Sequence, residues 1–270
     1  MVTVGDMSTN NIQIPTDASS LTSGAAMPLL GFGTWQLRGD VASEATATAL
    51  DAGYRHLDTA AMYRNETEVG KALESSGLNR DDAFVTTKFN PRSGDAELDV
   101  LRRSLDQLGT DHVDLWLVHA PADDARNRSV WESYVSAQQD GLARDIGVSN
   151  FSLDQIDAVT DATGVRPAVN QIEWRPTMHD RSVLEGHRTR GVLLEGYSGL
   201  RGGILHDPVV GRVAEEVGRT PAQVLVRWHL QHGIAVIPRS SQPDHIRDNA
   251  DVAGFTLDDD QMAALDALGR

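Results

Sequence analysis

The chain of 270 residues contains no cysteine, which excludes disulfide bonds, thiolate metal sites and a cysteine nucleophile. It has no uninterrupted apolar run long enough to cross a bilayer, so no membrane partner is expected. The first twenty residues are rich in Ser, Thr, Asn and Asp, and they lack the basic start and apolar centre of a secretory signal. These absences predict a cytoplasmic protein.

Basic residues are scarce, because 24 Lys and Arg stand against 39 Asp and Glu and give a net charge of −15. Nucleic acid is therefore not an expected partner, since phosphate binding needs a basic surface. One small anionic ligand is still compatible with this charge where the local field is positive. The histidines show no His-x-x-x-His spacing, so no metal site is expected.

Short strand-like runs alternate with helix-like stretches along the chain, and no linker or change in composition divides it. The strand-like runs are 29–35, 56–59, 83–88, 113–119, 145–149, 168–173, 192–197 and 235–239. The helix-like stretches are 41–52, 66–75, 95–108, 130–141, 153–160, 181–190, 221–232 and 257–268. Eight strands separated by helices predict a (β/α)8 TIM barrel in the α/β class.

The start of the chain has a different pattern. Residues 1–20 are predicted to be a mobile leader, and residues 21–270 a single barrel domain. Thr22-Ser-Gly24 is typical of a turn, which predicts a hairpin that plugs the amino-terminal end of the barrel.

Four groups that move or stabilise protons lie at the carboxyl ends of three successive strand-like runs. Asp58 lies near the end of the second run and Tyr63 in the loop after it, Lys88 ends the third, and His119 ends the fourth. The carboxyl ends of barrel strands meet at one face, where active sites are built. Taken singly, each residue has common structural roles, such as a turn former or a surface charge. Their joint placement at the strand ends favours catalysis.

The chemistry of these groups suits reduction of a carbonyl. A tyrosine with a pKa near ~10 is a reluctant proton donor at neutral pH. The Lys88 ammonium, held by Asp58, is expected to lower the pKa of Tyr63 so that it acts as general acid. His119 is expected to orient the carbonyl.

From about Met27 onward the chain contains a series of motifs at barrel-wide spacing: Leu30-Gly-Phe-Gly-Thr-Trp35, Gly53-Tyr-Arg-His-Leu-Asp-Thr-Ala60, Thr86-Thr-Lys88, Val113-Asp-Leu-Trp-Leu-Val-His119, Gly147-Val-Ser-Asn-Phe151, Val169-Asn-Gln-Ile-Glu173 and Val236-Ile-Pro-Arg-Ser240. With these motifs the chain resembles the aldo-keto reductase family, in particular the bacterial type similar to 2,5-diketo-D-gluconate and methylglyoxal reductases. The resemblance implies NADPH-dependent reduction of aldehydes or ketones, with Asp58, Tyr63, Lys88 and His119 as a catalytic tetrad.

The resemblance also implies how the cofactor is held without a Rossmann domain. No Gly-x-Gly-x-x-Gly opens a helix in this sequence, in agreement with that implication. The implied contacts run from the nicotinamide to the adenine: Ser149, Asn150, Gln171, Tyr197, Ser198, Leu200, Arg239, Ser240, His245, Asp248 and Asn249. His245 stands where relatives commonly have Arg, so NADH is a weaker alternative cofactor.

Three features bear on the substrate. The expected pocket is formed by Trp35, Tyr54, Phe89 and Ala120, and Ala120 replaces the Trp common in relatives. The chain ends soon after residue 268, without the long carboxyl-terminal loop of many relatives. A more open site with broad acceptance of small aldehydes and ketones is therefore expected, in a protein that works as a monomer.

Two other functions fit parts of the pattern. A sensor or regulatory protein on the same fold would bind the cofactor without turnover, and the intact tetrad disfavours it. A lyase that uses Lys88 as a Schiff base needs a lysine without a tight carboxylate partner, and Asp58 disfavours that alternative.

Overall fold

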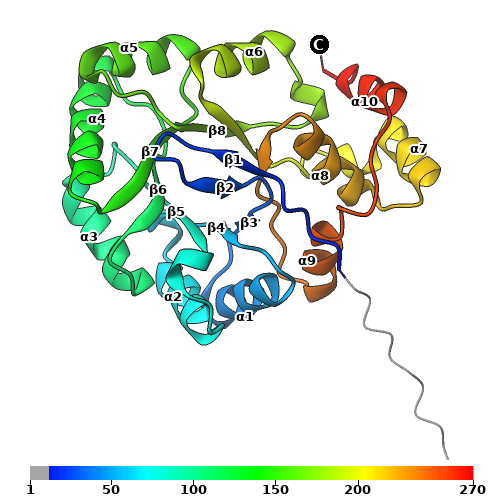
Figure 1. The fold of residues 1–270 in the computed structure, drawn as a ribbon, viewed down its shortest axis with the longest axis horizontal. Coiled ribbons are helices and arrows are strands. Elements are labelled where there is room, and N and C mark those ends of the chain that lie inside the picture. The colour runs from blue at the N-terminus through cyan, green and yellow to red at the C-terminus, as the bar shows by residue number, and fades with distance from the viewer. Residues whose placement is uncertain (1–11, 270) are drawn as a thin grey trace, which may run out of the picture.

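Eight parallel strands form one curved sheet in the computed structural model, which describes residues 12–269 (Figure 1). The strands are β3 Phe32–Gly33, β4 His56–Asp58, β5 Phe84–Phe89, β6 Val113–Val118, β7 Ala143–Ser149, β8 Val169–Glu173, β9 Leu193–Tyr197 and β10 Ala235–Val236, each paired with the next. Backbone bonds from Gly31 N to Val236 O (2.9 Å) and from Val236 N to Leu29 O (2.7 Å) join the two edges. The sheet therefore closes on itself, and the predicted α/β barrel of the TIM type is confirmed.

Helices surround the strands on the outside of the ring (Figure 1). The α-helices are α1 Gly39–Asp51, α2 Glu66–Ser75, α3 Glu97–Leu108, α4 Asp124–Gln139, α5 Leu153–Thr163, α6 Arg181–Arg190, α7 Pro208–Val217, α8 Pro221–Gln231, α9 Pro243–Ala250 and α10 Asp259–Asp266. Four short 3-10 helices lie in the connections: η1 Ala61–Tyr63, η2 Arg80–Asp82, η3 Pro176–Met178 and η4 Ile204–His206.

Local chemistry sets several of these boundaries. Thr220 accepts a hydrogen bond from the backbone N of Gln223 (3.2 Å), and the Gln223 side chain accepts one from the backbone N of Thr220 (3.0 Å). This capping box, with Pro221 at the first helical position, starts α8 where the sequence predicts it. At the end of α3, Gly109 has a φ of 68°, a left-handed conformation that glycine adopts without a steric penalty.

The core lies between the strands and the inner faces of the helices. All six residues of β5 and all six of β6 are buried, as expected of parallel strands covered on both sides. Trp116 on β6 stacks on Tyr134 of α4 with ring centroids 3.6 Å apart. Trp116 therefore belongs to the packing of the barrel and not to a substrate pocket.

An antiparallel hairpin, β1 Ala18–Ser20 and β2 Ala26–Pro28, precedes the barrel. Thr22 in its turn donates a hydrogen bond to Asp145 Oδ1 (2.6 Å), and the Ser23 backbone donates to the same oxygen (3.1 Å). Asp145 is buried near the amino end of β7, so the turn is tied to that end of a barrel strand. β1 falls within the stretch that the sequence predicts to be a leader; residues 1–11 of that stretch lie outside the described residues.

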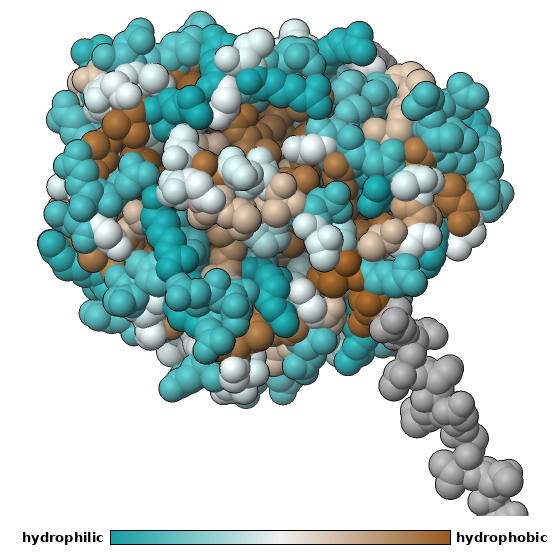
Figure 2. Space-filling view, viewed as in Figure 1, coloured by the Kyte–Doolittle hydropathy of each residue, from teal (hydrophilic) through white to brown (hydrophobic). Residues whose placement is uncertain are grey.

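The structure differs from the predicted elements at several places. α4 begins at Asp124 instead of residue 130, and α7 and α9 have no counterparts among the predicted helices. β3 and β10 are only two residues long, and one isolated bridge, Leu30 with Val236, lies across the closure. Figure 2 shows the face of Figure 1 as mainly hydrophilic, with hydrophobic side chains scattered across it. Among residues 12–269, none of the helices has the length and apolar character needed to span a bilayer.

Candidate active site

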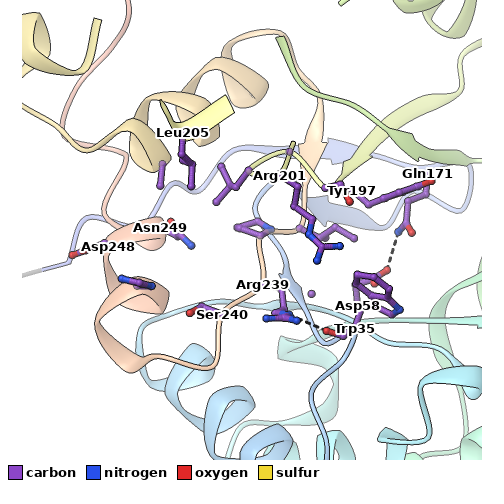
Figure 3. A pocket seen from close by; sticks show the side chains of 18 of the residues that line it. Trp35, Asp58, Gln171, Tyr197, Arg201, Leu205, Arg239, Ser240, Asp248 and Asn249 are labelled. Atoms are coloured by element: carbon purple, nitrogen blue, oxygen red, sulfur yellow. Dashed lines mark hydrogen bonds between the residues drawn. The ribbon is translucent and has the colours of Figure 1, made fainter. Parts of the chain in front are cut away.

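A cavity of about 770 Å³ opens where the barrel strands end and their loops begin (Figure 3). All of the predicted cofactor contacts line it: Ser149, Asn150, Gln171, Tyr197, Ser198, Leu200, Arg239, Ser240, His245, Asp248 and Asn249. Asp58, Tyr63 and His119 also line it, whereas Lys88 lies behind them in the barrel interior. The fold thus brings these predicted residues together around one cavity, which we call the cleft.

A buried ion pair forms the floor of the cleft. The Lys88 ammonium donates to both carboxylate oxygens of Asp58 at 2.6 Å and to the Thr59 carbonyl at 2.9 Å. Burial alone would lower the pKa of Lys88, but the charge and hydrogen bond of Asp58, together with Tyr63 and Glu195, outweigh burial and the net shift is upward. Lys88 is therefore held charged, because each of its ammonium protons has an acceptor.

Tyr63 and His119 stand above this pair at the cleft wall. Tyr63 ends η1, and its ring meets the His119 ring edge to face with centroids 5.6 Å apart. The Lys88 Nζ lies 5.1 Å from the centre of the Tyr63 ring. Burial, together with the Lys88 charge, lowers the pKa of His119 to about 3, so its imidazole is neutral at physiological pH.

The pKa of Tyr63 departs from the sequence-based prediction. Burial raises this pKa, and the Asp58 charge adds to the rise, while the Lys88 charge opposes both. The net shift is upward, so the predicted net lowering of the Tyr63 pKa is wrong. The reason is physical, since the phenol is mostly buried and desolvation outweighs one ammonium whose charge Asp58 neutralises.

A row of amide and hydroxyl groups forms one wall of the cleft. The Tyr197 hydroxyl donates to Asn150 Oδ1 (2.9 Å), and Asn150 Nδ2 donates to Ser149 Oγ (3.1 Å). Asn150 and Ser198 have φ values of 61° and 57°, in the left-handed region that residues other than glycine rarely adopt. Such backbone strain tends to persist where the surrounding structure holds a functional geometry.

Two arginines project into the cleft on its other side (Figure 3). Arg239 donates to the Trp35 carbonyl (2.9 Å) and to Gln36 Oε1 (2.8 Å), while the Arg201 guanidinium lies 4.9 Å from the centre of the Trp35 ring. Within residues 12–269 neither arginine forms an ion pair with a carboxylate. Burial and the nearby Arg201 charge lower the pKa of Arg239. Two like charges held together without a carboxylate suit an anionic ligand.

Helix α9 forms the far end of the cleft. His245, Asp248 and Asn249 all lie on this helix and line the cavity. Arg247 of the same helix faces Asp244 at 3.6 Å and does not line the cleft, whereas His245 does.

The predicted substrate pocket is only partly assembled. Trp35 lines the cleft and is 44% exposed. Tyr54 and Phe89 lie in the hydrophobic core instead, where the Tyr54 hydroxyl donates to the Ile246 carbonyl (3.1 Å). Ala120 lies just beyond β6 but does not line the cavity. Tyr54 precedes β4, at the amino end of that strand, and Phe89 ends β5 with its side chain in the core, so neither lines the cleft.

Two residues of the site were missed by sequence reasoning. Arg201 carried a weak signal, as a single cation before Gly202-Gly203 in a loop. Glu195 carried a stronger one, because it is a carboxylate inside the apolar run 192–197 of a buried strand. Its side chain is fully buried and accepts a hydrogen bond from Gln171 Nε2 (2.8 Å).

Comparison with known proteins agrees with this site. The sequence profile described as the Aldo/keto reductase family matches residues 29–270. The chain is 42% identical to 2,5-diketo-D-gluconic acid reductase B of Corynebacterium sp. (93% of this chain, 92% of the relative). It is 38% identical to methylglyoxal reductase DkgA of Escherichia coli (93% and 92%).

Comparison with solved structures points to the same family. A mutant of Gox0644 in complex with NADPH superposes with a TM-score of 0.89 at 38% identity, over 94% of each chain. An aldo/keto reductase from Brucella melitensis superposes with a TM-score of 0.90 at 36% identity, over 95% of this chain and 99% of the other. The chain therefore belongs to the aldo/keto reductase family and is an NAD(P)H-dependent oxidoreductase.

Proposed function

We propose that the protein reduces small aldehydes and ketones to alcohols with NADPH, and that Tyr63 is the general acid. The observation that carries the proposal is the buried Lys88–Asp58 pair beneath Tyr63 and His119 at the wall of one cleft. When bound, the cofactor supplies the hydride. The residues of this chain supply the proton and the orientation of the carbonyl.

Tyr63 holds its proton at neutral pH, because the net shift of its pKa is upward. It is thus a donor to a carbonyl oxygen that gains negative charge during reduction. As the proton leaves, the Lys88 ammonium stabilises the phenolate, and Asp58 keeps that ammonium charged. The neutral His119 orients the carbonyl by hydrogen bonding.

The cleft suits a dinucleotide phosphate. Its volume lies within the range of about 300–1,000 Å³ that is typical of ligand sites. Arg239, with Ser240 and His245, is assigned to the 2′-phosphate, and Asp248 and Asn249 to the adenine. Ser149, Asn150 and Gln171 are assigned to the nicotinamide carboxamide, Tyr197 to the face of its ring, and Ser198 and Leu200 to the pyrophosphate. NADH is proposed as the weaker cofactor.

The surroundings of Lys88 disfavour the two alternative functions, a Schiff-base lyase and a cofactor sensor. A Schiff-base lyase needs a neutral lysine, whereas the pKa of Lys88 is raised and its ammonium is bound by Asp58. A cofactor sensor has no need for a buried ion pair beneath a phenol. The names of two relatives make 2,5-diketo-D-gluconate and methylglyoxal the first substrates to assay.

Four further properties are proposed along with the activity. The enzyme acts as a monomer in the cytoplasm, on a small-molecule substrate, which the acidic and cysteine-free composition favours. The amino-terminal hairpin closes the barrel end opposite the cleft, and its hydrogen bonds to Asp145 near the amino end of β7 support this. Sedimentation analysis tests the oligomeric state.

The activity is tested with Tyr63→Phe, which deletes only the phenolic hydroxyl. We expect oxidation of NADPH by methylglyoxal, followed by its nicotinamide absorbance, to fall by about 10²–10⁴-fold, the usual contribution of a general acid. Binding of NADPH, followed by tryptophan fluorescence, should stay within about twofold of wild type, because the hydroxyl contributes no more than a weak interaction with the cofactor. A wild-type protein that binds NADPH but reduces no carbonyl in a broad panel would favour the sensor instead.

A further inference from the structure

Glu195 is a carboxyl group in the barrel interior that the proposed reaction does not use. It lies on β9, and its side chain is fully buried. Its Oε2 accepts a hydrogen bond from Gln171 Nε2 (2.8 Å), and its Oε1 has no hydrogen-bond partner among the described residues. A buried carboxyl group with one satisfied oxygen is costly, so its position calls for an explanation.

Its contact with Gln171 determines the orientation of an amide in the cleft wall. Gln171 Nε2 donates to Asp58 Oδ2 (2.8 Å) and to Glu195 Oε2 (2.8 Å). A carboxamide has two N–H donors, and both are used in this way. The remaining atom, Oε1, accepts no hydrogen bond from the described residues and is not among their buried, unpartnered atoms. Gln171 lines the cleft, so Oε1 is available to a ligand there (Figure 3).

We propose that Glu195 is a positioning residue, which together with Asp58 fixes the Gln171 amide so that its Oε1 faces the cleft as an acceptor. A rotated amide would turn its oxygen toward Asp58 and Glu195, and acceptor would face acceptor. The inference rests on the proposed function, because the group that Oε1 would receive is the carboxamide N–H of the nicotinamide. Glu195 would thereby help the protein to recognise the nicotinamide end of the cofactor.

The charges around Glu195 are consistent with this role. Asp58 and Lys88, from β4 and β5, compensate each other, and His56 of β4 faces Glu195 with Nε2 at 3.7 Å from Oε1. Burial and the Asp58 charge raise the pKa of Glu195 to about 8, and burial lowers the pKa of His56 to about 4. His56 Nδ1 faces the Pro28 carbonyl (3.2 Å) and its Nε2 faces Thr86 Oγ1 (3.2 Å), so His56 makes no hydrogen bond to Glu195. A proton on Glu195 Oε1, the oxygen without a partner, leaves Oε2 as the acceptor for Gln171.

The test compares NADP with its 3-acetylpyridine analogue, which has a methyl ketone in place of the carboxamide and so lacks the N–H donors. Wild type should bind the analogue about tenfold more weakly than NADP, as expected for one lost hydrogen bond. Glu195→Met, which removes the acceptor but fills a similar volume, should reduce this ratio to below about threefold, since the Gln171 amide is then free to rotate. Glu195→Gln, whose side-chain oxygen can still accept, should keep the wild-type ratio.

The ratio separates positioning from a structural role, because a general loss of packing weakens both ligands alike. Should Glu195→Met not fold, Glu195→Ala takes its place. A ratio in the apolar variant equal to that of wild type, in protein with an unchanged unfolding midpoint, overturns the inference and leaves the proposed function standing. Failure of wild type to bind either dinucleotide would overturn the proposed function itself.

A separate cluster lies outside the cleft, where three segments meet. His179 follows η3, His232 follows α8, and Asp266 ends α10. One ligand atom from each lies within 4.8 Å of the others, with His232 Nε2 at 2.8 Å from Asp266 Oδ1 and His179 Nε2 at 3.7 Å from Oδ2. None of the three residues lines the cleft. Sequence spacing could not reveal this cluster, because its members are far apart in the chain.

We infer that this cluster binds a divalent transition-metal ion such as Zn²⁺, which would join α10 to the barrel. Zn²⁺ binds imidazole nitrogen and carboxylate oxygen at about 2.0–2.2 Å, so ligand atoms lie within about 4 Å of one another around the ion. The His179 ring is largely buried and makes no hydrogen bond at either nitrogen with the described residues, and an ion beside Nε2 would supply the missing partner. Trp228 Nε1 donates to Asp266 Oδ1 (2.7 Å) and holds the carboxylate in place, as outer contacts do around metal sites.

Metal-free protein is titrated with Co²⁺, followed by visible absorption, and with Zn²⁺, followed by thermal unfolding. Wild type should develop Co²⁺ absorption bands and a higher unfolding midpoint with Zn²⁺, because a ligand of the folded state stabilises it. His179→Gln and His232→Gln should each lose both effects, and His112→Gln, a change outside the cluster, should keep them. Equal midpoint shifts in all four proteins, or no absorption bands in wild type, would overturn the metal site and leave a hydrogen bond between His232 and Asp266.

Discussion

At the scale of single residues, both the stability of the fold and the proposed chemistry depend on the Lys88–Asp58 ion pair. Both side chains are almost fully buried, and three hydrogen bonds satisfy the ammonium. Such a pair is weak evidence for stability by itself, because desolvation of two charges offsets their attraction. Removal of one partner, by contrast, destabilises the fold, since it leaves the other charge buried and uncompensated.

Lys88→Met should therefore destabilise the fold by about 3–5 kcal/mol, the usual cost of breaking a buried pair. Urea unfolding followed by tryptophan fluorescence measures this cost. The double variant Lys88→Met with Asp58→Asn should recover part of it, because no charge is then left unpaired. If the double variant is less stable than the single one by the full effect of a second independent change, charge compensation is not the reason.

Arg239 tests the proposed preference for NADPH. Arg239→Ala should raise the dissociation constant of NADPH by tenfold or more, about 1.4 kcal/mol, while that of NADH changes much less. Arg239→Lys is the matched control, which keeps a charge but loses the fork that bonds the Trp35 carbonyl and Gln36. Fluorescence titration with both cofactors gives the ratio. Equal weakening of both cofactors by Arg239→Ala would show that the side chain only supports the loop around Trp35.

Residue types at strand ends made much of the site predictable from the sequence. Asp58, Lys88 and His119 lie at the ends of strand-like runs, and their joint placement there, not any one of them alone, predicted the site. The direction of the Tyr63 pKa was not predictable, because it depends on how deeply the phenol is buried. Nor was the inward turn of Tyr54 and Phe89 into the core. Both depend on packing between distant segments.

At the scale of helices and strands, strong local signals in the sequence were sufficient to predict where an element begins, and weak signals were not. The capping box and proline at the start of α8 set its boundary as predicted. The first six residues of α4, 124–129, include Asp124, Arg126 and Arg128 but no large apolar residue, so hydrophobic periodicity begins only at residue 130. α7 contains a proline and a glycine and lies outside the strand–helix alternation, which hid it.

The hairpin is the element whose role is least evident from local signals. Thr22→Val removes the hydroxyl that donates to the buried Asp145, and should cost about 1–3 kcal/mol because a buried carboxylate loses a partner. The control is Thr48→Val, the same change at a hydroxyl that bonds only its own helix at Glu44, and it should be nearly neutral. The urea unfolding midpoints of the two variants, each compared with wild type, measure these costs. Equal midpoints would mean that the turn contributes nothing to the stability of the barrel.

For the whole molecule, the stability at different pH values is set by groups buried in the uncharged form. Burial lowers the pKa of His56 and His229 to about 4 and that of His119 to about 3, so all three are neutral in the folded protein at physiological pH. The unfolded chain binds protons on these histidines below about pH 6.5, so stability falls as the pH drops through that window. Glu195 acts in the opposite direction, since its raised pKa means that the folded state keeps a proton that the unfolded chain releases.

Stability should therefore be highest near about pH 6.5, where the histidine window ends while the Glu195 window continues to about pH 8. Between this pH and about 8, stability should fall by no more than about 2 kcal/mol, the amount that one proton contributes over this range. Urea unfolding at pH values from 4 to 9 gives the curve, and Glu195→Gln should remove the fall on the alkaline side while the acidic side stays as in wild type. A wild-type curve that is flat above pH 6.5, or a variant that keeps the fall, would mean that Glu195 is already ionised in the folded protein.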